Sequence, residues 1–317
     1  MKAGGWNPSA PIGAAPVLRQ CVNLWTLVGQ PRPGREWSLE RKIHAVKEAG
    51  FDGIADRLSP QHARWCDRLG LMRVGLVVSN EPREFRDRLA EQREGGATRV
   101  NVILGAHDTS TSAALRWVLR LMEQGEDLGL EVSVETHRDS CTETPEKLQA
   151  LVRAYRQATG RILRLTWDCS HHAVVKHLLP PFWPRFAGQA KLIQAASQFH
   201  FRPFNGHHCQ VPVMDGRGRL TPEVRDYLPF MGDLMRTWLS AAPAGAEMIA
   251  VPELGPLWMG YNLHSFPPSW DQAQVMRHLI KRSWVGALTG RDAAIGRVYL
   301  RGSRRAQSGP VPAFGVA

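Results

Sequence analysis

Short runs of apolar residues alternate along the chain with longer stretches in which apolar residues recur every three or four positions. The short runs are typical of strands buried on both faces and the longer stretches of amphipathic helices, so the alternation predicts βα units and a parallel sheet. Eight strand–helix pairs predict a (β/α)8 barrel, or TIM barrel, a fold that typically needs about 250 residues. The eight strands are expected within residues 17–28, 51–58, 71–79, 99–106, 130–136, 162–167, 192–201 and 246–251.

Three of the helices have clear start signals. Ser38 precedes the first helix, and Thr144 and Thr221 each stand directly before a Pro-Glu pair. A hydroxyl can cap the first turn, proline suits the first helical position, and an acid is favourable near the positive end of the helix dipole. The helix after the sixth strand is expected to be interrupted, because three prolines fall within residues 180–184.

One domain accounts for most of the 317 residues. We expect an N-terminal extension of residues 1–16, a barrel of residues 17–300, and a basic, loosely packed tail of residues 301–317. No apolar run approaches the roughly 18 residues that a membrane-spanning helix needs, and the first residues lack the apolar core of a secretory signal. Five cysteines form no Cys-x-x-Cys pair, which favours a reducing cytoplasm as the location.

The chain is basic, with 40 Lys and Arg residues against 29 Asp and Glu residues and a formal net charge of +11. Such a balance suits nucleic acid, an anionic membrane or an acidic substrate. The basic residues, however, are scattered over the expected helices, and only residues 301–305 form a cluster. This distribution favours a solvated basic surface over a nucleic-acid interface.

Four consecutive strands each end in a side chain that can bind a metal. These are Glu135 in VSVETHR, Asp168 in LTWDCSHH, His200 in QFHFRPF and Glu253 in VPELGP. The carboxyl ends of the strands form the active site of such barrels, so the four side chains are expected to converge. Three converging carboxylates repel one another unless a cation neutralises them. The donor set favours one divalent ion, with Mn²⁺ as the first choice and Mg²⁺, Co²⁺ or Zn²⁺ as alternatives.

These residues resemble the xylose-isomerase-like barrels, which include sugar epimerases, hydroxypyruvate isomerases and abasic-site endonucleases. The resemblance covers residues 17–290 and rests on the four strand-end residues together with the spacing Asp168-x-x-His171. It implies that Glu135, Asp168, His200 and Glu253 bind one divalent metal. It also implies that His171 contacts a substrate oxygen.

The resemblance extends to a second substrate contact and to assembly. Epimerases of this family have an arginine soon after the seventh-strand histidine, and Arg202 is the nearest match, although its spacing from His200 is shorter than in the epimerases. Barrels of the family often pair, so a homo-oligomer is expected.

The chemistry of the expected site suits a small carbohydrate. A bound cation polarises the carbonyl of a sugar or keto-sugar and stabilises the enediolate formed when the neighbouring carbon loses a proton. Glu135 and Glu253 are the natural acid/base pair for moving that proton. Alternatively both are ligands alone, and His171 or a water moves it. We therefore predict an isomerase or epimerase that acts through a metal-bound enediolate.

Other residues near the expected strand ends are candidate substrate contacts. His207 and His208 lie in a long loop after the seventh strand, and they suit a second metal site, substrate binding or hydrogen bonds within the loop. His107 follows the fourth strand and is either a substrate contact or a helix-entry residue. Trp25 and Trp258 suit stacking on a sugar ring and equally suit packing in the core.

Three other functions are open to this sequence. A lyase that expels a substituent from a keto-glycoside would use the same base and metal. A zinc-dependent abasic-site endonuclease would bind three metals, with His107, His207 and His208 as additional ligands. The second strand, however, ends in IADRL without a histidine, and no Asp-x-His pair follows the seventh strand. A non-enzymatic sensor would have lost ligands, whereas all four are present.

Overall fold

Eight strands form where the apolar runs predict them, and they close into a barrel in sequence order. The computed structural model describes residues 14–290. All neighbouring strands are parallel, including β8 and β1, which pair with Val17 opposite Glu247. The strands are β1 (Val17–Asn23), β2 (Gly53–Asp56), β3 (Met72–Ser79), β4 (Arg99–Leu104), β5 (Glu131–Glu135), β6 (Leu165–Asp168), β7 (Gln198–His200) and β8 (Glu247–Val251).

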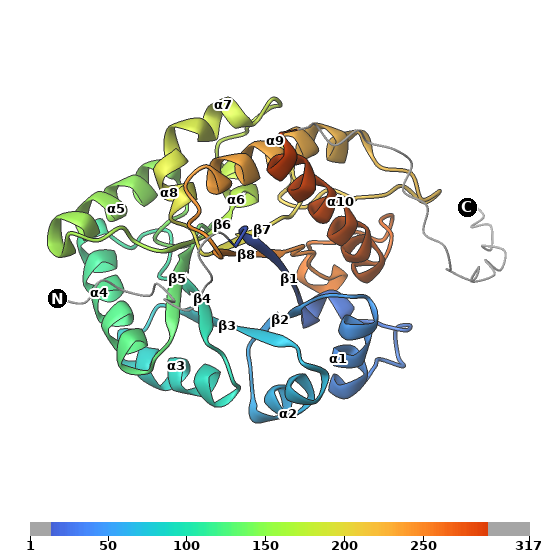
Figure 1. Cartoon of the computed structure of the whole chain (residues 1–317), viewed down its shortest axis with the longest axis horizontal. Helices are drawn as coiled ribbons and strands as arrows, with labels where there is room; N and C mark the ends of the chain where they lie inside the picture. The colour runs from blue at the N-terminus through green and yellow to red at the C-terminus, as the bar shows by residue number, and fades with distance from the viewer. Residues whose placement is uncertain (1–13, 291–317) are drawn as a thin grey trace, which may run out of the picture.

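Helices surround the barrel as an outer layer (Figure 1). The described part of the chain therefore has the predicted (β/α)8 TIM-barrel fold. The predicted extension lies outside the described residues except for residues 14–16, and the predicted tail lies outside them entirely. The helices are η1 (Leu24–Leu27), α1 (Leu39–Glu48), α2 (Pro60–Leu69), η2 (Pro82–Glu84), α3 (Phe85–Glu94), α4 (Thr111–Asp127), α5 (Pro145–Thr159), α6 (Cys169–Val175), α7 (Trp183–Phe186), η3 (Ala187–Gln189), α8 (Ala190–Gln194), α9 (Pro222–Leu239), η4 (Leu257–Met259) and α10 (Ser269–Thr289).

The predicted helix starts are confirmed by the hydrogen bonds of their caps. The hydroxyl of Ser38 accepts from the backbone N–H of Arg41 at 3.2 Å, and α1 begins directly after it. Thr144 and Thr221 cap α5 and α9 in the same way. Each cap satisfies a backbone donor that has no partner within the helix, so the chain turns sharply from loop to helix at these points.

The segment between β6 and β7 differs from the prediction in detail. Residues 192–201 were expected to form the seventh strand, but the first part of this run belongs to α8 and the strand itself is only Gln198–His200. A short apolar run suits a buried helix turn as well as a strand, so periodicity cannot separate the two. The prolines break this region into the short helices α6, α7 and α8, as expected.

Side chains of each strand alternate between two hydrophobic layers. Val22 and Ile54 belong to the large core that lies between the barrel and the helices. Their neighbours Cys21 and Ala55 belong to a small cluster made by strand residues, which therefore fills the barrel interior. Ile249 is in the same cluster. Every second residue of a strand points into the barrel. Toward the carboxyl ends of β5 to β8, the residues at these inward positions are polar.

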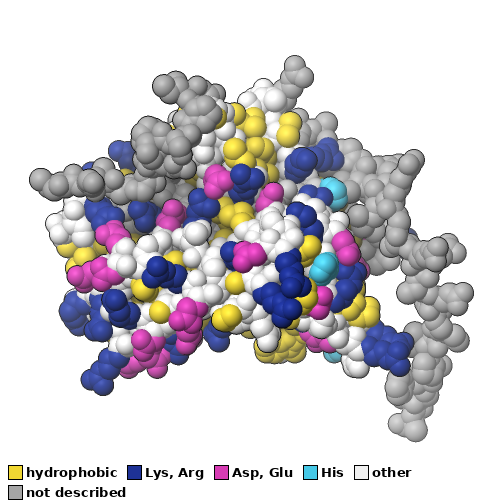
Figure 2. Space-filling view, turned by 60° about the horizontal axis from the view of Figure 1, so that its bottom comes forward, with side chains coloured by type: hydrophobic (Ala, Val, Ile, Leu, Met, Phe, Trp, Pro, Cys, Tyr) yellow, Lys and Arg dark blue, Asp and Glu magenta, His cyan; other side chains and the backbone are white. Residues whose placement is uncertain are grey.

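Basic and acidic side chains are interspersed on the surface. On the face shown in Figure 2, Lys and Arg side chains lie beside Asp and Glu side chains. Some of the basic side chains form ion pairs with acidic neighbours, such as Arg73–Asp67 and Arg161–Glu126, each with an N–O distance of 2.5 Å. This pattern supports the interpretation of a solvated basic surface. Among residues 14–290, every helix is too short or too polar to cross a membrane.

Candidate metal centre

The four predicted ligands converge at the carboxyl end of the barrel. Glu135, Asp168 and His200 are the last residues of β5, β6 and β7, and Glu253 stands two residues after the end of β8. The parallel register places Asp168 directly opposite His200. One ligand atom from each of the four side chains lies within 4.8 Å of the others, and all four residues are buried. Residues far apart in sequence thus form the cluster predicted from the strand ends.

His200 points its Nδ1 atom at the carboxylates. This atom lies 2.9 Å from Oε2 of Glu253, 3.3 Å from Oε1 of Glu135 and 4.0 Å from Oδ2 of Asp168. It makes no hydrogen bond of acceptable geometry. A buried nitrogen without a hydrogen bond, surrounded by three carboxylates, is the arrangement expected of a ligand that a cation would complete.

Gln198 holds the other nitrogen of the His200 ring. The side-chain amide nitrogen of Gln198 lies 2.8 Å from Nε2 of His200. Burial lowers the pKa of His200, but the carboxylates of Glu253 and Glu135 outweigh burial and hold this pKa well above its usual value. A raised pKa leaves a proton on Nε2, and a metal on Nδ1 would leave the same proton there. The Gln198 amide would therefore present its oxygen to Nε2 in both states, which the assignment of the two amide atoms allows.

Arg202 contributes a buried cation to the same cluster. Its Nη2 atom lies 2.5 Å from Oδ2 of Asp168 and also donates to Oε2 of Glu253. Only 1% of the Arg202 side chain is exposed. Burial lowers the pKa of Arg202, but the two carboxylates outweigh it and raise this pKa well above its usual value. With His200 neutral, as a metal ligand would be, the three carboxylates and one guanidinium carry a net charge of minus two, which one divalent cation would neutralise.

Asp168 serves two purposes at the end of β6. Its Oδ1 accepts from the backbone N–H of Ser170 at 2.9 Å and caps α6, while Oδ2 faces the cluster. Burial raises the pKa of Asp168, but Arg202 and the neighbouring imidazoles outweigh burial and hold this pKa well below its usual range. The carboxylate is therefore ionised and available to a cation.

Glu135 is held by an amide from the neighbouring strand. Nδ2 of Asn101 on β4 donates to Oε2 of Glu135 at 2.5 Å. Burial raises the pKa of Glu135, but His200 and His137 outweigh burial, so that its pKa lies below the usual value. The second oxygen, Oε1, faces His200. One oxygen is thus fixed by the protein and the other is directed into the cluster.

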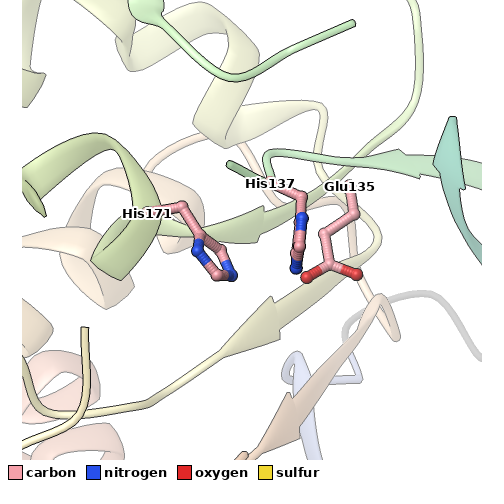
Figure 3. A group of neighbouring side chains, drawn as sticks. All are labelled: Glu135, His137 and His171. Atoms are coloured by element: carbon pink, nitrogen blue, oxygen red, sulfur yellow. The ribbon is translucent and has the colours of Figure 1, made fainter. Parts of the chain in front are cut away.

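A second group of possible ligands shares Glu135. Figure 3 shows the rings of His137 and His171 on the same side of this carboxylate, and one ligand atom from each of the three lies within 4.8 Å of the others. The ring centroids of the two histidines are 4.0 Å apart. Nδ1 of His137 donates to the backbone carbonyl of Arg138, which leaves Nε2 as an acceptor in the neutral ring.

His171 is fully buried in the first turn of α6. Its Nε2 lies 3.4 Å from Oδ2 of Asp168, and neither ring nitrogen makes a hydrogen bond within the described residues. Burial lowers the pKa of His171 well below its usual value, so the ring is neutral at physiological pH. A neutral buried imidazole with both nitrogens free can donate one hydrogen bond and accept another from a ligand.

Several residues that line this cluster were not predicted from the sequence. Gln198 precedes His200 by two positions and His137 follows Glu135 by two, and Arg138 and Asn101 lie beside them. The signal that identifies the first two is the period of two along a strand, because residues two apart point to the same side of the barrel. Arg202, which was predicted, obeys the same rule relative to His200.

His107 and the loop histidines belong to neither group of possible ligands. His107 is exposed, and its Nδ1 lies 2.9 Å from Oδ1 of Asp139, whose hydrogen bond raises the pKa of this histidine. His207 and His208 are exposed and receive their contacts from the side chain of Asn205, which accepts from both backbone N–H groups. Substrate contacts by these three histidines stay predictions.

The two candidate tryptophans have different surroundings. Trp25 lies beside Tyr261, with ring centroids 5.9 Å apart, and its indole nitrogen is buried without a hydrogen bond among the described residues. Trp258 lies in η4 and is 69% exposed. The guanidinium carbon of Arg202 lies 4.7 Å from the centroid of the Tyr261 ring. The aromatic wall beside the cluster is thus made by Tyr261 and Trp25.

Solved structures share this fold, whereas no protein-family model and no curated protein matches the sequence. An L-ribulose 3-epimerase is 13% identical, with 87% of this chain and 96% of that chain covered and a TM-score of 0.59. A D-allulose 3-epimerase from Methylomonas sp., in complex with D-allulose, is 14% identical over 86% and 99% of the two chains, with a TM-score of 0.55.

A third similar structure is a xylose isomerase-like TIM barrel protein from Mycobacterium smegmatis in complex with magnesium. It is 15% identical over 87% of this chain and 98% of that chain, with a TM-score of 0.53. At such low identity the likeness establishes the fold. The chain has the fold of the xylose isomerase-like TIM barrels, as its sequence motifs predicted.

Proposed function

We propose that this protein is a divalent-metal-dependent isomerase or epimerase of a sugar or keto-sugar. The observation that carries the proposal is the buried cluster of Glu135, Asp168, His200 and Glu253, whose ligand atoms lie within 4.8 Å of one another. The similar folds of two sugar 3-epimerases support it. The magnesium complex of a third similar barrel supports a divalent ion.

The donor set fits a hard or borderline divalent ion. Three carboxylates and one imidazole suit Mn²⁺ first, with Mg²⁺, Co²⁺ and Zn²⁺ as alternatives. The net charge of minus two on the carboxylates and Arg202 supports one ion at this position. When bound, the ion would supply Lewis-acid polarisation of the substrate carbonyl and make the neighbouring C–H more acidic.

Glu135 and Glu253 are the proposed acid/base pair. They come from β5 and from the segment after β8, on either side of β6 and β7 in the closed barrel. One carboxylate takes the proton from the carbon beside the carbonyl, and the electrons of the broken C–H bond move onto the carbonyl oxygen to give an enediolate. For an isomerase, the first carboxylate passes this proton to the next carbon, and the hydroxyl proton moves to the former carbonyl oxygen. For an epimerase, the other carboxylate takes a proton from solvent water and delivers it to the opposite face of the first carbon.

His171 and Arg202 are the proposed substrate contacts. The free ring nitrogens of His171 suit a hydroxyl or carbonyl oxygen, because the neutral imidazole can donate or accept. Nε and Nη1 of Arg202 make no hydrogen bond within the described residues, so they are available to negative charge that develops on the substrate. A lyase acting on a keto-glycoside would share the first proton transfer and differ in expelling a substituent.

The residues that favoured an endonuclease belong to neither group of possible ligands. His107 pairs with Asp139 on the surface, and the loop histidines bind Asn205. We therefore do not propose a cluster of three zinc ions. A cytoplasmic location and pairing into a homo-oligomer stay predictions from the sequence.

Hydrogen exchange with solvent tests the proposed chemistry. Metal-loaded protein, incubated in D₂O with a panel of ketoses, keto-sugar acids and keto-glycosides, is expected to place deuterium on the carbon next to the carbonyl of at least one compound. NMR and mass spectrometry measure the incorporation. Treatment with a chelator should abolish it, and added Mn²⁺ should restore it. Absence of exchange with every compound, in protein shown to contain metal, would contradict enediolate chemistry.

A further inference from the structure

We propose that the substrate of this site is a sugar acid whose carboxylate is bound by Arg138 and Arg202 beside Tyr261. This inference rests on the proposed function, because it names the class of substrate for the same site. It depends on one feature that a neutral sugar does not explain, namely a second guanidinium at the edge of the metal cluster with no acidic partner.

Both guanidinium groups lie against the ring of Tyr261. Their carbon atoms lie 4.7 Å (Arg202) and 5.0 Å (Arg138) from the centroid of its ring. Burial raises the pKa of the Tyr261 hydroxyl, so this residue stays neutral at physiological pH and does not compensate either charge. Cation–π attraction to the ring stabilises each guanidinium at this position.

Arg138 has no carboxylate partner within the described part of the chain. Its guanidinium is half-buried, and Nη1 donates to Sγ of Cys209 at 2.8 Å. A thiol is a weak acceptor and does not balance a full positive charge. The carboxylate of the neighbouring Asp139 is exposed and accepts from His107 instead. The cation is therefore placed at the site without its counter-ion.

Arg202 adds unused donors beside the same ring. Its Nη2 atom donates to Asp168 and Glu253. Nε and Nη1 make no hydrogen bond among residues 14–290, and only 1% of the residue is exposed to solvent. Buried N–H groups without partners are costly, so oxygen atoms of a ligand are the expected acceptors.

The charge count favours a monoanion. One divalent ion and Arg202 neutralise the three carboxylates of the cluster, and Arg138 then remains as a single positive charge. A sugar carboxylate carries one negative charge and balances it. A phosphate ester carries about −1.5 to −2 at neutral pH and exceeds it. His171, which is neutral, is left to contact hydroxyl groups, so the two arginines determine which end of the sugar carries the acid.

Matched pairs of non-reacting sugars test this inference on the full-length, Mn²⁺-loaded protein. Each pair is an aldonate and the alditol of the same carbon chain, which differ in one carboxylate. Isothermal titration calorimetry is expected to show at least one aldonate binding about tenfold or more tightly than its alditol. Arg138→Gln should lower the affinity for that aldonate about tenfold to a hundredfold, the range for loss of a charge-assisted hydrogen bond. The affinity for the alditol should stay nearly unchanged.

Arg153→Gln, at an exposed position of α5, is the matched control and should leave both affinities unchanged. Metal content and melting temperature verify that each variant is folded and loaded. Equal affinity for aldonate and alditol, no binding of any aldonate, tighter binding of a sugar phosphate, or an aldonate preference that survives Arg138→Gln would each overturn the inference.

The two proposals fail separately. Hydrogen exchange on a neutral keto-sugar without any aldonate preference would remove the sugar-acid inference and keep the isomerase. An aldonate preference that depends on Arg138, without hydrogen exchange on any keto acid, would remove the isomerase and keep the anion site.

Discussion

Glu135→Gln is expected to lower kcat by about 10²- to 10⁴-fold, the usual contribution of a general acid or base. The substitution keeps the size of the side chain, and the new amide oxygen can still accept from Asn101 as Oε2 does. It removes the negative charge that would take the substrate proton. Steady-state kinetics and the rate of deuterium incorporation measure the effect, and metal content is determined on the same sample.

Glu131→Gln provides the control at the opposite end of the same strand. Glu131 lies 3.8 Å from Arg99 and is remote from the ligand cluster along β5, so kcat should stay within twofold of the original value. A Glu135→Gln protein that retains metal and a tenth or more of the original turnover would show that another group moves the proton. His171 would then be the first candidate.

Arg202→Met is expected to destabilise the metal-free protein by about 3–5 kcal/mol, the cost of breaking a buried ion pair. Asp168 and Glu253 would lose their shared counter-ion while remaining buried. Added Mn²⁺ should recover more stability in the variant than in the original protein. The affinity of the variant for Mn²⁺ should rise about tenfold or more, because the guanidinium that competes for the same carboxylate oxygens has been removed. Urea unfolding in chelator and in Mn²⁺, together with calorimetry, measures both effects.

Arg86→Met is the matched control. Arg86 and Asp127 form an exposed pair with an N–O distance of 3.3 Å, and such pairs contribute about 0–1 kcal/mol. Unchanged stability of metal-free Arg202→Met, or weaker Mn²⁺ binding by it, would contradict the role of Arg202 as a counter-ion inside the ligand cluster.

The barrel and the four strand-end residues were predictable because their signals are local. Apolar runs mark the strands, and caps such as Ser38 and Thr144 mark the helices, each through contacts within a few residues. Parallel pairing then brings successive strand ends to one end of the barrel. Asp168 and His200 therefore become neighbours once the strands themselves are assigned. The sugar-isomerase hypothesis followed from the order of these residues.

Contacts between distant segments could not be predicted in the same way. Nothing in the sequence around Tyr261 indicates that its ring carries the guanidinium groups of Arg138 and Arg202, because these contacts depend on the packing of three separate loops. The sequence likewise did not show that His107 turns toward Asp139 on the surface. Loop conformation, rather than strand periodicity, decides such positions.

The most direct test of the central claim is a crystal structure of the protein grown with Mn²⁺, measured with anomalous scattering at the manganese edge. One ion per chain is expected, contacted by an oxygen of each of Glu135, Asp168 and Glu253 and by Nδ1 of His200. Elemental analysis of the same protein should give about one Mn²⁺ per chain. Anomalous density absent from this cluster, or located instead between Glu135, His137 and His171, would contradict the account.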